Sequence, residues 1–178
     1  TCGMTVTVTA RGDRTAARRC ALQLARAAWA GRGRYVLDVI NVDRALDLAL
    51  GSSQALLFAD VADNPGGGGR GNTSWILSAF DQARVPNVVL GIFIDPELAA
   101  HAHALCVGAE FEAVFNRTES EYSRRYTARA RILCLRDGEQ LGRRGLYRDK
   151  KFSLGASALI ELTGSGMRVV VGSLRRQL

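Results

Sequence analysis

The residues with the clearest capacity for chemistry lie in one loop, Asp60 to Asn72, which reads Asp-Val-Ala-Asp-Asn-Pro-Gly-Gly-Gly-Gly-Arg-Gly-Asn. Four consecutive glycines permit backbone torsions that other residues avoid, and they let a ligand approach the main chain closely. Two carboxylates and an amide precede the glycines, so the loop could orient a polar substrate or stabilise an oxyanion. We therefore predict substrate contacts from Asp60, Asp63, Asn64, Gly66, Gly67, Gly68, Gly69, Asn72 and Thr73.

The surroundings of the loop favour this functional interpretation over a flexible surface connection. Residues 55–59 are apolar without alternation, which predicts a strand covered on both faces. Residues 74–83 have helical spacing, so the loop joins the end of a strand to the start of a helix. Ligand sites gather at such strand ends, and a helix start offers unpaired N–H groups. The glycine spacing matches neither of the common phosphate-binding motifs.

The segments around the loop predict an α/β fold. Strands and helices alternate between residues 55 and 115, which is typical of an open parallel or mixed sheet with flanking helices. The expected elements are strands at 55–59, 87–94 and 110–115, and helices at 74–83 and from Asp95 to about Cys106. Trp75, Phe58, Leu90 and Ile92 are expected in the core.

The N-terminal part predicts a strand and two helices. Met4–Ala10 alternates apolar and hydroxyl side chains, as a strand with one wet face does, and helices are expected at 14–30 and 44–50. Polar residues that can cap a helix precede both helices: Asp13 or Thr15 for the first, Asn41 or Asp43 for the second.

The last third of the chain has a different pattern of expected secondary structure. Short strands and tight turns follow residue 123, with strands at 126–135, 158–162 and 167–171. We therefore expect one domain over 1–178, with an α/β part at 1–122 and a β-rich subdomain at 123–178.

Composition excludes several classes of protein. The net charge is +7, but the arginines are spread along the chain without a nucleic-acid motif, so we expect a solvated surface and no nucleic-acid partner. No run of 18 apolar residues is present, so no membrane span is expected. The four cysteines lie far apart, which favours reduced thiols and a cytoplasmic location; they are Cys2, Cys20, Cys106 and Cys134.

The only two histidines are His101 and His103, which imitate a metal-binding pair. A spacing of two on a helix points them about 200° apart, so one helix cannot direct both at one metal. We predict no metal ligands in this chain, and we expect His103 beside the substrate cleft. No residue is assigned a catalytic role.

The sequence also resembles a known family. Ala-Asp-Val-Ala-Asp-Asn-Pro-Gly-Gly-Gly at 59–68, with Gly71 and Asn72, is similar to the signature of the C-terminal domain of the MlrC proteins, zinc metallopeptidase-like proteins named for microcystin degradation. Weaker similarities support it: Asp95-Pro96-Glu97, Ala102-His103 with Val107-Gly108-Ala109, and Val169-Val170-Val171-Gly172-Ser173.

This resemblance implies that metal binding and substrate binding are divided between two domains of a longer parent protein. The zinc ligands of the family lie in a separate N-terminal domain, and the glycine loop faces that zinc site and helps to form the substrate cleft. Asn72 and Ser74 stand where the family commonly has Asp and Thr, which changes the charge beside the loop.

Two functional hypotheses follow. The chain is the C-terminal substrate-cleft domain of an MlrC-like zinc-dependent peptidase or amidohydrolase, inactive in isolation, with the N-terminal zinc domain as its partner and a peptide or amide as substrate. Alternatively, it is a stand-alone small-molecule binding module that uses the Asp60–Asn72 loop.

Overall fold

The computed structural model describes residues 4–145 and 148–176, so Cys2 lies outside the described residues. The chain divides into two compact units, Thr1–Ile40 and Asn41–Leu178. The expected division into an α/β part at 1–122 and a β-rich part at 123–178 stays a prediction.

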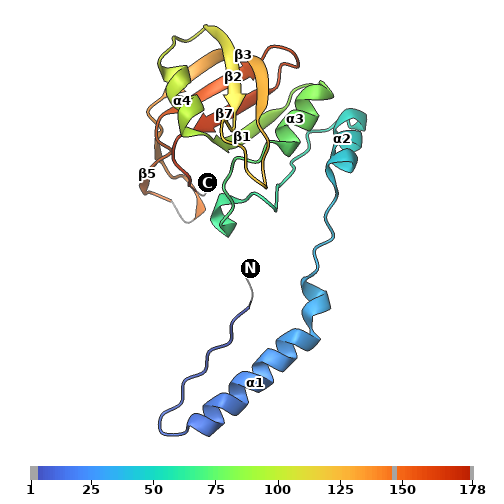
Figure 1. Cartoon of the computed structure of the whole chain (residues 1–178), viewed down its shortest axis with the longest axis vertical. Coiled ribbons are helices and arrows are strands. Elements are labelled where there is room, and N and C mark those ends of the chain that lie inside the picture. Colours follow the sequence, from blue (N-terminus) through green and yellow to red (C-terminus); the bar gives the residue numbers. More distant parts are fainter. Residues whose placement is uncertain (1–3, 146–147, 177–178) are drawn as a thin grey trace. The chain divides into compact units, whose positions relative to one another are not determined.

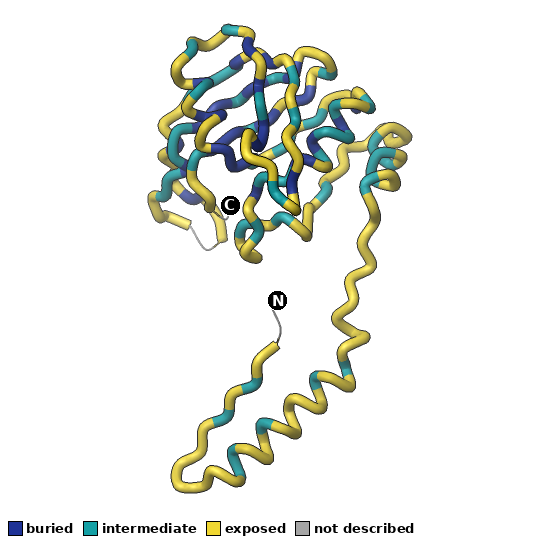
Figure 2. Tube along the Cα trace, viewed as in Figure 1, coloured by how far each residue is buried: buried dark blue, intermediate teal, exposed yellow. Residues whose placement is uncertain are grey.

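The first unit consists mainly of one long helix. Helix α1 spans Arg14–Ala30, and Asp13 caps it because its Oδ1 accepts a bond of 2.8 Å from the N–H of Ala16. A short 3-10 helix, η1, follows at Arg32–Tyr35. None of the residues of α1 is buried, as Figure 2 shows. The strand expected at Met4–Ala10 is wrong: the described residues of this unit contain no strand, so no neighbour pairs with its backbone.

The second unit contains a five-stranded mixed sheet with the order β1-β7-β6-β3-β2 (Figure 1). Strands β1 and β7 run parallel, and the other neighbours are antiparallel. The strands are β1 (Val89–Ile94), β2 (Glu110–Phe115), β3 (Tyr126–Arg136), β6 (Ser157–Leu162) and β7 (Arg168–Gly172). A separate two-stranded sheet joins β4 (Glu139–Leu141) to β5 (Lys151–Ser153). The mixed sheet with flanking helices confirms the expected α/β class.

Helices accompany the sheet on the described residues of this unit. They are α2 (Val42–Gly51), η2 (Pro65–Gly67), α3 (Trp75–Gln82) and α4 (Pro96–His103). Asn41 caps α2 and Asp95 caps α4, each through a side-chain oxygen that accepts a backbone N–H of the first turn. Helix α4 ends at His103 rather than near Cys106.

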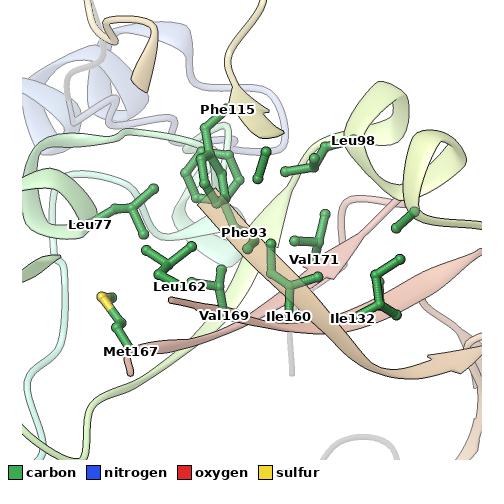
Figure 3. Close-up of a cluster of buried hydrophobic side chains, with 14 of the residues drawn as sticks. Leu77, Phe93, Leu98, Phe115, Ile132, Ile160, Leu162, Met167, Val169 and Val171 are labelled. Atoms are coloured by element: carbon green, nitrogen blue, oxygen red, sulfur yellow. The ribbon is translucent and has the colours of Figure 1, made fainter. Parts of the chain in front are cut away.

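The core lies between one face of the sheet and helices α3 and α4. Buried side chains alternate along the strands, so that they share one face, and Leu77 and Leu98 reach them from the two helices (Figure 3). The rings of Phe93 and Phe115 meet edge to face with centroids 5.1 Å apart. This packing fixes the strand ends beside which the loop lies.

The opposite face of the sheet carries a row of alternating charges. Glu110, Arg131, Glu161 and Arg168 are successive cross-strand partners from β2 to β7. Arg131 donates to Glu110 at 2.6 Å, and this bond lowers the pKa of the Glu110 carboxyl below its usual value. Because these paired charges are well solvated, this face of the sheet remains exposed to solvent and needs no apolar layer packed on it.

Two further expected features of the fold are wrong. Residues 55–59 form no strand, and Leu57 is 97% exposed, although Phe58 packs its ring against Phe80. Trp75 is 51% exposed rather than in the core, because its indole nitrogen donates to the carbonyl of Tyr122 at the surface. Phe58, Leu90 and Ile92 are only partly buried.

Candidate functional site

The Asp60–Asn72 loop is held in shape by the two oxygens of Asp63. Oδ1 accepts from the N–H of Gly71 at 2.9 Å, and Oδ2 accepts from the N–H of Thr73 at 2.6 Å. These bonds close a turn eight to ten residues wide around the glycines. Asp60 accepts short-range bonds from the N–H groups of Ala62 and Asp63, and its Oδ2 also accepts a long bond of 3.5 Å from the hydroxyl of Thr73. Asp63 therefore fixes the loop, and its predicted substrate contact stays a prediction.

Asn64 and the glycines form a compact 3-10 turn. Asn64 Oδ1 accepts from the N–H groups of Gly66 and Gly67 at 2.8 and 3.3 Å, and its carbonyl accepts from Gly69 at 2.8 Å. Gly68 adopts a φ of 96° and donates to the carbonyl of Pro65. The amides of Gly66, Gly67, Gly68 and Gly69 are therefore all used inside the loop. The glycine run supplies shape and close approach rather than free donors.

Several donors of the loop region remain available to a ligand. The side-chain amide of Asn64 and the backbone N–H groups of Arg70 and Asn72 have no hydrogen-bond partner among the described residues. Asn64 and Arg70 are exposed, so a substrate could reach these groups. Asn64 combines both functions: its oxygen holds the turn, and its nitrogen faces solvent.

The far end of the loop is fastened to β1. The carbonyl of Gly71 accepts from the N–H of Ile94 at 2.7 Å. Gly71 has a φ of 75°, and a Cβ there would stand 2.9 Å from side-chain atoms of both Ile94 and Pro65. Only glycine therefore fits at this contact between loop and strand.

A buried polar network holds the segment that follows. The Asn116 amide nitrogen donates to the carbonyl of Asn72 and to the hydroxyl of Ser123, both at 2.6 Å. The Asn116 N–H donates to Asp95 Oδ2 at 3.1 Å, and Ser74 donates to the carbonyl of Arg124 at 2.6 Å. The network joins the ends of β1 and β2 to the start of α3. It was not predicted, because Asp95 showed only a capping signal and Asn116 and Ser123 showed none.

One acceptor beside this network lacks a partner. Asn72 Oδ1 is buried and has no hydrogen-bond partner in the described structure. Asn72 stands where the resemblance led us to expect an aspartate, so the difference lies at a buried position. The amide still presents an acceptor there without a buried charge.

The structure does not bring His103 to the loop. His103 Nε2 lies 3.0 Å from the carbonyl oxygen of Ser157, at the start of β6. The ring of His101 packs edge to face on Phe111 with centroids 5.3 Å apart. The two histidines thus point to different surroundings, and the expected cleft contact of His103 stays a prediction.

A cleft of about 830 Å³ opens beside the loop. Its walls are residues 52–60 on one side and 85–94 on the other. Of the predicted site residues, Asp60, Asp63, Asn64 and Thr73 line it, whereas Gly66, Gly67, Gly68, Gly69, Asn72 and His103 do not.

Two arginines near the C-terminal end of the chain also reach this region. Arg175 donates to the carbonyl of Gly69 at 3.2 Å, and Arg176 lines the cleft. In the sequence this pair indicated only a solvated surface. Its position depends on β7, which brings residues 175 and 176 back beside the loop and so leaves no local signal.

The described residues do not supply a metal centre. No group of three histidine, cysteine, aspartate or glutamate side chains in 4–145 and 148–176 could hold a metal ion. The available carboxylates of the loop are also bonded to its own backbone. The same part of the chain has no helix with the length and apolar character needed to span a membrane.

Comparison with known proteins identifies the family. Residues 58–178 match the family described as MlrC C-terminus, and the chain belongs to this family. The crystal structure of a "Putative metallopeptidase" from Mesorhizobium sp. BNC1 is similar in fold, with a TM-score of 0.75 and 19% identity. The similarity covers 90% of this chain and 32% of that one, so the chain spans about a third of that protein's length. No curated protein matches the chain.

Proposed function

We propose that this chain is the substrate-cleft domain of an MlrC-like zinc-dependent peptidase or amidohydrolase, with the zinc ligands in an N-terminal domain of the same parent protein. The observation that carries the proposal is the family match, which begins at the cleft wall and includes the whole glycine loop. The absence of a metal-binding group among the described residues is consistent with zinc held elsewhere.

Within this proposal the loop binds and orients the substrate. Zinc in the N-terminal domain would supply Lewis acidity to the scissile carbonyl. The Asn64 side-chain nitrogen is the donor best placed to bond a substrate oxygen, because it is exposed while the Asn64 oxygen is fixed by Gly66 and Gly67. The glycines allow the substrate to lie close to the backbone.

The proposal is tested by steady-state kinetics on the full-length parent protein. Gly67→Val places a side chain on the loop surface, where a Cβ would meet only Asn64 Cβ, at 3.8 Å. Asn64→Asp keeps the capping oxygen but removes the donor nitrogen. Each variant should keep its fold and zinc content and lose about 10²-fold or more in kcat, as removal of an oxyanion donor does elsewhere.

The matched control is Gly164→Val, in the turn between β6 and β7. A Cβ at Gly164 meets nothing within 4 Å, so this change adds the same side chain at another open turn. Its kcat/KM should equal that of the unaltered protein. Unaltered kcat/KM in all three variants would show that the loop is only a connection, and a parent without metal-dependent hydrolysis would support the binding-module alternative.

A further inference from the structure

Strand β1 has a free backbone edge. It is the end strand of the sheet, and its neighbour β7 occupies only one side. The carbonyl of Val88 accepts from Arg168 N on the β7 side at 2.9 Å. Since successive residues of a strand direct their N–H and C=O groups to opposite sides, those of Val89 point away from β7. At the other end of β1 this outer side is taken by the bond from Ile94 to Gly71.

The opposite wall of the cleft is also an unpaired backbone. Residues 55–59 form no strand, and no backbone hydrogen bond involves them in the described structure. Phe58 fixes the segment by packing on Phe80 of α3, with ring centroids 6.0 Å apart. Leu57 is 97% exposed and Val89 is 66% exposed, so apolar side chains stand open on both walls.

This combination specifies what the cleft can hold. Unpaired N–H and C=O groups on two facing walls are matched by another polypeptide backbone, which pairs along its whole length. A strand as long as β1 extends about 20 Å. The cleft volume of about 830 Å³ lies within the range of ligand-binding clefts.

We propose that the cleft binds an extended, mainly apolar peptide as an added β-strand on the free edge of β1, and that this peptide is the substrate of the parent protein. The inference rests on the proposed function for the identity of that peptide. Strand addition gives affinity through the main chain, and alternate side chains contact the apolar walls. One end of the bound peptide then lies at Asp60 and Thr73, which line the same cleft.

Continuity with the loop favours a substrate over other occupants. Asp60, Asp63 and Asn64 line the cleft together with β1, so a peptide lying along β1 leads directly to the loop. A second copy of the chain, or closure of residues 55–59 onto β1, would fill the same edge. Both are outcomes of the test.

The test uses the 178-residue chain and a capped probe peptide, acetyl-Lys-Thr-Val-Leu-Val-Thr-Lys-amide. Its control has the same side chains with the backbone amide nitrogen of every residue N-methylated, so that neither edge of the peptide offers N–H groups. Calorimetry should detect binding of the probe, and hydrogen exchange should slow at Val89 and at 55–59. The methylated peptide should neither bind nor slow exchange, because it cannot pair along a strand.

Variants at Val89 provide the second measurement. Val89→Pro removes an N–H from the free edge without removing a bond to β7, and proline is tolerated at such positions. Val89→Thr keeps that N–H and serves as the control. We expect Val89→Pro to weaken binding of the probe about three- to tenfold, and Val89→Thr to leave it within about twofold.

Several results would overturn the inference. Equal binding of the methylated peptide would show an apolar site without strand addition. Protection of Val89 and 55–59 without any peptide would show self-closure, or dimerisation if it grows with protein concentration. Kinetics of the parent separate the two proposals: hydrolysis with KM unchanged by Val89→Pro contradicts only strand addition, whereas probe binding by a parent without hydrolytic activity contradicts only the proposed function.

Discussion

The two aspartates of the loop differ in what their carboxylates hold. Asp63 bonds across the loop to Gly71 and Thr73 and is partly buried, whereas Asp60 is exposed and bonds mainly to the next turn of backbone. A loop of glycines has high conformational freedom when unfolded, so the long-range bonds of Asp63 offset a large ordering cost.

Asp63→Ala should therefore destabilise the fold by about 1–3 kcal/mol, because two backbone N–H groups lose a charged acceptor. Asp60→Ala is the control and should change the free energy of unfolding by about 0.5 kcal/mol or less. Urea unfolding measures both. Equal effects of the two changes would contradict the structural role of Asp63.

Tyr126 provides a prediction that depends on pH. Burial disfavours its phenolate, and its hydroxyl donates to Asp81 Oδ2 at 2.6 Å; both effects raise the pKa of Tyr126. Because the folded pKa exceeds the unfolded value of about 10, the stability from this group is complete below pH about 10 and is lost as pH rises further. Ultraviolet titration of the chain minus that of Tyr126→Phe should show a tyrosine ionising above about 10; a difference curve centred at the ordinary value would contradict this.

For individual residues, the sequence predicts contacts between near neighbours in the chain but not contacts between distant ones. The caps by Asp13, Asn41 and Asp95 follow from residue type and the next few positions, and all three are present. The bonds from Asn116 and Ser123 to Asn72 join residues 44 and 51 positions apart. No local pattern specifies such a pair, because it depends on where the strands end in space.

Among the elements, strand order is the feature that hydrophobic pattern leaves open. The alternation of strands and helices predicted an α/β fold, and that is confirmed, but it specified no strand order. In the structure β1 and β2 lie at opposite edges, because β7, β6 and β3 come between them. Residues 55–59 have the composition of a buried strand, but composition cannot supply a partner for their backbone.

Asn116 connects these elements, and its removal should be costly. Asn116 has a φ of 52° and is 6% exposed. Glycine adopts this φ readily, so Asn116→Gly leaves the backbone conformation unchanged and removes only the side-chain amide. We expect a loss of about 1–3 kcal/mol in the free energy of unfolding, since Ser123 and Asn72 each lose a buried donor.

The control for this change is Asn87→Gly. Asn87 has a similar φ of 58° but is exposed and has no side-chain hydrogen bond among the described residues. Its replacement should change stability by about 0.5 kcal/mol or less. A loss at Asn87 as large as that at Asn116 would show that the backbone conformation, and not the buried network, carries the effect.

For the molecule as a whole, the distribution of buried residues separates two parts. Every buried hydrophobic residue of the described chain lies between Leu77 and Val171, and α1 has none. Helix α2 is intermediate: Ala45, Leu46 and Ala49 pack against the core although none is fully buried. The family match starts at residue 58, after α2.

These facts predict different outcomes for two shortened chains. A chain of residues 41–178 keeps the core and α2, so its urea midpoint should equal that of the full chain. A chain of residues 53–178 keeps the whole family match but loses α2, which exposes apolar surface beneath Leu46 and its neighbours. It should lose about 2–3 kcal/mol in the free energy of unfolding. A lower midpoint for 41–178 would show that residues 1–40 stabilise the sheet unit, whereas equal midpoints for both shortened chains would show that α2 contributes nothing to the fold.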